Sequence, residues 1–185
     1  MSVPLPSSLE APLRPVGGRP GARFLLSHPA HLLALGFGCG LSPAAPGTVA
    51  TLWAWLSFLV LQAWLPPAAL GWVVVASVPV GWWASTVTAG HLGVADPGAI
   101  VADEILSFWL VLWLLMPAGW LVQFLAFILF RFFDAAKPGP VGWADKLFHG
   151  FGWRGGLGIV FDDLVAAFCT LLVLALGVRL AWTLG

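Results

Sequence analysis

The chain has 185 residues, of which 60% are hydrophobic and only 9% are charged, and its formal net charge is zero. Ordinary soluble domains carry about 25% charged residues, so this composition excludes a soluble fold and favours an integral membrane protein. A neutral chain also has no electrostatic attraction for nucleic acid, so we expect no nucleic-acid partner.

The first 23 residues are rich in Pro, Gly and Ser, and their basic residues are Arg14, Arg19 and Arg23. They contain no apolar run of the kind found in a signal peptide. We therefore expect residues 1–23 to form a disordered basic tail, and residues 24–185 to form a single membrane-embedded domain.

Residues 24–35 are apolar, but they are too few to cross a bilayer and Pro29 interrupts them. A transmembrane helix needs about 20 apolar residues, with a lower limit near 17. This segment is predicted to lie along the membrane interface or to re-enter the membrane partway.

Longer apolar stretches further along the chain predict about five transmembrane helices in an all-α membrane protein. Residues 99–134 are too many for one straight span, and the turn signal Pro117-Ala118-Gly119 divides them. The predicted spans are residues 49–65, 68–89, 99–116, 119–134 and 158–184.

Basic residues predict the orientation, because Lys and Arg concentrate in cytoplasmic flanks. The loop between the last two spans carries Lys137, Lys146 and Arg154, and five spans place it on the same side as the basic tail. The turns on the opposite side are uncharged. The tail and this loop are therefore predicted to be cytoplasmic, with the C-terminus outside.

Two adjacent acidic pairs are predicted near the starts of apolar helices, and Asp134 ends a third helix at the same face. A carboxylate inside a span costs about 2.5–3.5 kcal/mol on insertion scales, so these side chains need compensation. Mg²⁺ prefers carboxylate oxygens and commonly bridges them to a substrate phosphate. The alternative is that the pairs only complement the positive ends of helix dipoles. The cluster suited to one or two Mg²⁺ ions comprises Asp103, Glu104, Asp134, Asp162 and Asp163.

Two cations accompany the acidic cluster. Arg131 precedes Asp134 by three residues on a predicted helix, so their side chains can meet, and Lys137 follows three residues later. These cations either clamp a phosphate or pair with the carboxylates. The alternative for Arg131 is a side chain that snorkels at a helix end.

A segment rich in Gly, Ser and Pro, residues 36–48, precedes the first predicted span. Such a loop can direct backbone N–H groups and a helix N-terminus toward an anion. Thr48 either donates a hydrogen bond there or caps the helix.

Other polar residues receive no functional role from the sequence. The histidines lack metal-ligand spacing and are expected to be solvated or interfacial, and Asp96 and Asp145 are expected to be loop or cap residues. The two cysteines form no CxxC pair, and Cys169 is expected to be a core residue. The histidines are His28, His31, His91 and His149.

Four groups of residues, in this order and spacing, resemble the motifs of the phosphatidylglycerophosphatase A family over roughly residues 30–183. They are residues 35–48; Asp96-Pro97 with residues 100–104; residues 130–134 with Lys137-Pro138; and residues 155–163. The resemblance implies Mg²⁺-dependent hydrolysis of phosphatidylglycerol phosphate to phosphatidylglycerol and phosphate. It also implies the bacterial inner membrane, with the active site facing the cytoplasm.

The chain departs from the family pattern at a few positions. Ala50 and Ser107 stand where the family usually has Gly, and Ala135-Ala136 replaces a larger apolar pair. These positions bear on packing and on the shape of the lipid headgroup more than on the charged set, so they affect substrate detail more than reaction type.

Residue roles follow from the chemistry of phosphomonoester hydrolysis, in which metal ions polarise phosphoryl oxygens and activate water. The predicted metal ligands are the five carboxylates above, with Glu104 serving as a further ligand or as the general base. Direct attack by water and an aspartyl-phosphate intermediate both remain open. The predicted catalytic residues are Glu104, Asp163 and Lys137, and the predicted phosphate-binding residues are Arg131, Lys137, Thr48 and Gly47.

Two other functions compete with this reading. A small cation transporter or channel would use the carboxylates as an ion site, but it would place them near the bilayer midplane. A metal-dependent lipid transferase is the other, although the chain lacks the Asp-rich signature of the alcohol phosphatidyltransferases.

Overall fold

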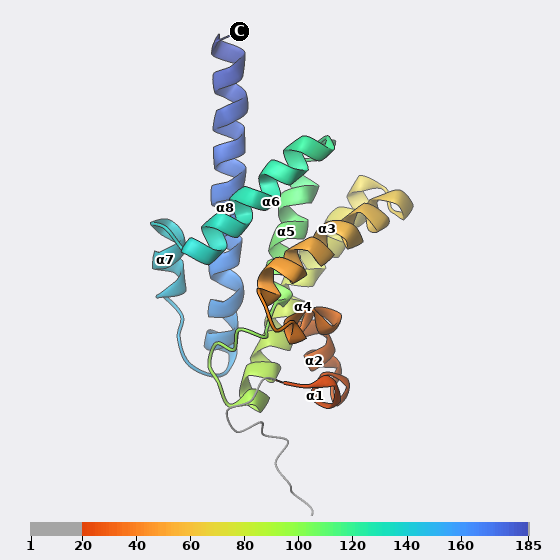
Figure 1. Cartoon of the computed structure of the whole chain (residues 1–185), viewed down its shortest axis with the longest axis vertical. Coiled ribbons are helices and arrows are strands. Elements are labelled where there is room, and N and C mark those ends of the chain that lie inside the picture. Colours follow the sequence, from red (N-terminus) through yellow and green to blue (C-terminus); the bar gives the residue numbers. More distant parts are fainter. Residues whose placement is uncertain (1–19, 185) are drawn as a thin grey trace, which may run out of the picture.

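A computed structural model describes residues 20–184, and all the regular structure in that range is helical (Figure 1), as predicted. Three short elements come first, five longer helices follow, and a short helix precedes the last of them. They are α1 (Ala22–Leu26), α2 (Pro29–Ala34), the 3₁₀ helix η1 (Gly36–Leu41), α3 (Pro46–Trp64), α4 (Pro67–Leu92), α5 (Ala102–Leu114), α6 (Trp120–Ala136), α7 (Pro140–Asp145) and α8 (Trp153–Leu184).

The five longer helices correspond to the five predicted spans. Among the described residues, α3, α4 and α8 are long and apolar enough to cross a membrane. Helix α4 runs without interruption through Pro79. Helices α5 and α6 have 13 and 17 residues, or about 20 Å and 26 Å at 1.5 Å per residue, so they are shorter than a typical span. The count of five spans stays a prediction.

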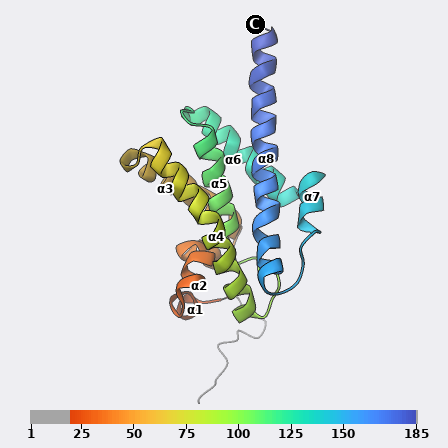
Figure 2. The ribbon, with the colours of Figure 1, turned by 180° about the vertical axis from the view of Figure 1, so that it is seen from behind.

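Helix α5 lies at the centre of the bundle, between α3, α4 and α8 (Figures 1 and 2). Its buried Phe108 contacts the rings of Phe127 and Phe130 on α6, with ring centroids 6.0 Å and 5.5 Å away. Because α5 is packed on several sides, its first turn is held rigidly between its neighbours. That first turn carries Asp103 and Glu104.

Helix α8 begins at Trp153, five residues before the predicted start of the last span. Residues 155–157, which precede that predicted start, lie inside the helix. The glycines there permit close packing: a Cβ at Gly156 would overlap Thr86 Oγ1, and one at Gly158 would overlap the carbonyl oxygen of Phe148. Because the helix begins earlier, Asp162 and Asp163 lie in its third turn, further from the helix start than predicted.

The N-terminal segment forms α1 and α2, which begin at Ala22, inside the predicted tail. Residues 1–19 of that tail, with Arg14 and Arg19, lie outside the described residues. His31 on α2 is only 2% exposed, and its Nε2 lies 2.8 Å from Nδ1 of His91 on α4. His31 is therefore buried and not solvated, and this pair joins the N-terminal segment to the end of α4.

Candidate active site

Every acidic residue in the described part of the chain lines one cavity of about 180 Å³. The carboxylates reach it from the α4–α5 loop, from the start of α5, from the end of α6, from α7 and from α8. They are the five predicted residues Asp103, Glu104, Asp134, Asp162 and Asp163, together with Asp96 and Asp145. Carboxylates gathered around one cavity produce a negative local potential that attracts cations.

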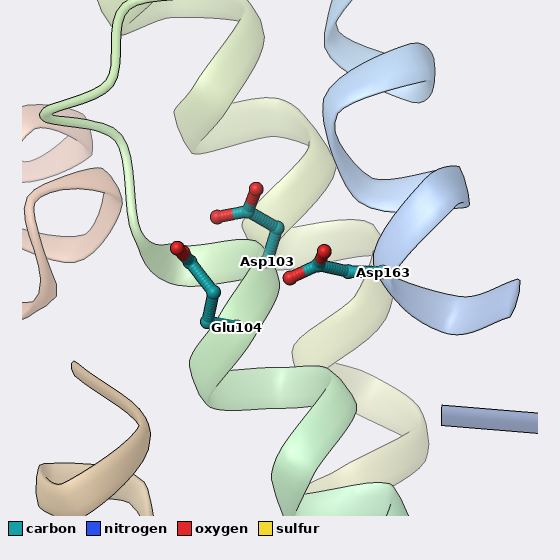
Figure 3. Close-up of side chains that lie close together, drawn as sticks. All are labelled: Asp103, Glu104 and Asp163. Atoms are coloured by element: carbon teal, nitrogen blue, oxygen red, sulfur yellow. The ribbon is translucent and has the colours of Figure 1, made fainter. Parts of the chain in front are cut away.

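Asp103 and Glu104 from α5 and Asp163 from α8 form the centre of the cluster (Figure 3). One oxygen from each lies within 4.8 Å of the others. Each residue also has a buried oxygen without a hydrogen-bond partner among the described residues: Asp103 Oδ1, Glu104 Oε2 and Asp163 Oδ2. Buried carboxylates require such partners, and three oxygens this close suit a hard divalent cation.

Arg131 contacts two of the cavity's carboxylates but does not itself line the cavity. Its guanidinium donates to Asp134, so the contact predicted from their three-residue spacing is present, and Nη1 lies 3.9 Å from Glu104 Oε1. Nη1 is also 3.5 Å from Thr51 Oγ1 on α3. The sequence analysis missed Thr51, because it approaches Arg131 only where α3 contacts α6 in the folded protein.

Lys137 lies directly after α6, in a left-handed conformation with φ of 44°. Its Nζ donates to Asp162 at 2.6 Å and also to Asp145. Burial alone would lower the pKa of Lys137, but the hydrogen bonds and charges of the two carboxylates outweigh it and raise the pKa. Lys137 therefore remains a cation in the cavity wall. Asp145 was expected to be a loop or cap residue, since nothing in the sequence relates it to Lys137.

Gly47 and Thr48 lie in the first turn of α3, and neither lines the cavity. The backbone at Gly47 is packed tightly against the site: a Cβ there would overlap Glu104 Oε1 and lie 3.0 Å from Arg131 Nη1. The N-cap is Ala45, so the capping alternative for Thr48 was wrong. Its phosphate-binding role stays a prediction.

Two further cavity residues come from loops that the sequence reading left without a role. Asp96 lies between α4 and α5, and His149 lies between α7 and α8 with an exposed side chain. Asp96 lies in a loop, as expected, and the exposure of His149 agrees with the expectation of a solvated or interfacial residue. The position of both residues at the cavity could not be predicted, because it depends on how the two loops meet.

Comparisons with known proteins identify the family of this chain. Residues 32–178 match the family model of phosphatidylglycerophosphatase A. The chain is 40% identical over 145 residues to phosphatidylglycerophosphatase A of Escherichia coli strain K12, covering 78% of this chain and 81% of that protein. It is 36% identical over 155 residues to phosphatidylglycerophosphatase A of Haemophilus influenzae, covering 83% and 91%.

A third relative carries a different name. The chain is 34% identical over 162 residues to a putative phosphatidylinositol-3-phosphatase of Bacteroides thetaiotaomicron, covering 83% of this chain and 94% of that protein. No solved structure matches the chain significantly. The family match covers all the residues that line the cavity, and the chain belongs to the phosphatidylglycerophosphatase A family.

Proposed function

We propose that this chain is a Mg²⁺-dependent phosphatase that hydrolyses phosphatidylglycerol phosphate to phosphatidylglycerol and phosphate in a bacterial inner membrane. The observation that carries the proposal is the gathering of all described acidic residues around one cavity in a chain of this family. The transporter alternative lacks support, because the relatives are named as phosphatases.

The five carboxylates predicted as metal ligands divide into two groups. Asp103, Glu104 and Asp163 have buried oxygens that lack partners, so they are the first choice as Mg²⁺ ligands. Asp134 and Asp162 already accept hydrogen bonds from Arg131 and Lys137, so their negative charges are balanced by the protein. When bound, Mg²⁺ would polarise the phosphoryl oxygens and neutralise charge that develops as the ester bond breaks.

The remaining residues bind the substrate phosphate, position the carboxylates or accept a proton from water. Lys137 lines the cavity and supplies an ammonium donor to a phosphate oxygen. Arg131 holds the Asp134 carboxylate and lies near Glu104, so it positions acidic groups more directly than it reaches substrate. Glu104 serves as a ligand or as the base that takes a proton from the attacking water.

The reaction is tested with purified protein in detergent or nanodiscs, by measuring inorganic phosphate released from three lipid phosphates. These are phosphatidylglycerol phosphate, phosphatidylinositol 3-phosphate and phosphatidic acid. We expect phosphatidylglycerol phosphate to be hydrolysed fastest. Faster phosphate release from phosphatidylinositol 3-phosphate would indicate that this lipid is the preferred substrate, in line with the name of the Bacteroides relative. No release from any of the three would contradict the phosphatase function.

A cytoplasmic site also predicts the position of the C-terminus. The cavity uses the N-terminal part of α8, whereas the C-terminal end of this helix extends beyond the bundle (Figure 1). At 32 residues, α8 is about 48 Å long, which exceeds the hydrocarbon core of a bilayer. An alkaline phosphatase fused after Gly185 should therefore be active, because that enzyme works only outside the cytoplasm. Activity of a cytoplasmic reporter at the same position would reverse the orientation.

A further inference from the structure

We infer that Asp145 is a positioning residue for the reaction, because it holds the Lys137 ammonium in the orientation that receives the substrate phosphate. The inference rests on the proposed function. Lys137 Nζ donates to Asp145 on α7 and to Asp162 on α8, and all three residues line the cavity. The ammonium is thus held from two separate helices.

The backbone between Lys137 and Asp145 is compact, which fixes both ends of this ion pair. Lys137 takes the left-handed conformation that ends α6, and a Cβ at Gly142 would lie only 2.6 Å from the Lys137 carbonyl oxygen. Val141 and Ala144 are fully buried, and α7 packs on α8. Asp145 therefore returns to Lys137 on a short and well-packed segment.

An ammonium has enough N–H donors to bind both carboxylates and still bind a phosphate. A Lys side chain has four carbons of flexible stem and three N–H donors. Asp145 and Asp162 accept two of these hydrogen bonds, and the third donor remains for a phosphate oxygen in the cavity. Without Asp145, only Asp162 would hold the ammonium, and Lys137 would sample orientations that miss the substrate.

A double-mutant cycle tests the inference by measuring kcat/KM of the purified protein on phosphatidylglycerol phosphate. We expect Lys137→Ala to lower kcat/KM roughly 100-fold and Asp145→Asn to lower it roughly tenfold, the range for hydrogen bonds to charged groups. In the Lys137→Ala background, Asp145→Asn should change kcat/KM by less than about twofold, because the group that Asp145 positions is already absent.

Asp96→Asn is the matched control, because it removes the same charge from the same cavity at a different element. Whatever factor Asp96→Asn changes kcat/KM by, we expect the same factor in the Lys137→Ala background. Inhibition by inorganic phosphate gives a second measurement: Asp145→Asn should weaken it, and Asp145→Glu, which keeps the charge, should restore part of it. Multiplicative losses for Asp145→Asn and Lys137→Ala would overturn the inference. Absence of phosphate release by the unmodified protein would instead defeat the proposed function.

Discussion

Asp163→Asn is expected to lower phosphate release per folded molecule by orders of magnitude, while the protein still inserts and folds. Asparagine keeps the size and polarity of the side chain but loses the anion. Asp163 is only 2% exposed, and its Oδ2 is one of the three buried carboxylate oxygens without a partner at the centre of the cluster. Loss of this charge removes a proposed metal ligand where the substrate charge must be neutralised. The measurement is turnover divided by the amount of monodisperse, folded protein.

The competing explanation is that Asp163 only complements the dipole of α8. A dipole partner contributes about 0.3–1 kcal/mol, and the effect falls off within the first turn. Because α8 begins at Trp153, Asp163 lies in the third turn, where this explanation predicts almost no effect on stability or turnover. Near-normal turnover of folded Asp163→Asn would therefore remove this residue from the site.

Thr170→Val provides the control on the same helix. Thr170 is seven residues after Asp163, which places it on the same face of α8, and it is fully buried. Its hydroxyl donates only to the carbonyl oxygen of Ala166, at 2.8 Å. Valine has nearly the same shape, so we expect turnover close to that of the unmodified protein. A large loss in Thr170→Val would show that turnover responds to packing anywhere along α8.

Hydrophobic runs identified the long helices well, because burial in a membrane leaves a strong compositional signal. Helix ends were harder to predict near glycine, because glycine can either end a helix or permit close packing inside one. In residues 155–158 it permits helix packing against Thr86 and Phe148, and α8 begins five residues before the predicted span. At Gly93, with φ of 69°, it does end a helix, close to the predicted end of the second span. The two roles of glycine differ in whether another segment packs against that position. A single sequence does not show which segments pack together.

The acidic centre of the site was also predictable, since carboxylates are rare in this chain and each one is conspicuous. All five predicted acidic residues line the cavity. The contacts around them were harder to predict because they depend on tertiary packing. Asp145 reaches Lys137 through the fold of α7, and Thr51 reaches Arg131 where α3 contacts α6. Spacing along one helix revealed only the pair of Arg131 and Asp134.

Removal of divalent cations is expected to abolish phosphate release, and Mg²⁺ is expected to restore it. The reason is the donor set: Asp103, Glu104 and Asp163 offer closely spaced oxygens, with no nitrogen or sulfur ligand in the group. Such a set favours Mg²⁺ over softer metals. The measurement is phosphate release after chelation with EDTA and dialysis, followed by titration with Mg²⁺. Full turnover in excess chelator would rule out the metal mechanism.

The same ion should stabilise the folded protein, which gives a test that does not depend on turnover. At 100 times its Kd, a ligand that binds only the folded state contributes about 2.7 kcal/mol, and each kcal/mol shifts the Tm by roughly 2–4 °C in a chain of this size. We therefore expect Mg²⁺ to raise the Tm by several degrees, and NaCl at matched ionic strength to raise it much less. In Asp163→Asn the Mg²⁺ shift should nearly disappear. The Tm without metal should rise, because one of three neighbouring carboxylates has been replaced by a neutral side chain. If Mg²⁺ raised the Tm of Asp163→Asn and of the unmodified protein equally, the ion would bind at other carboxylates. If NaCl raised the Tm as much as Mg²⁺ does, the effect would be screening of surface charge.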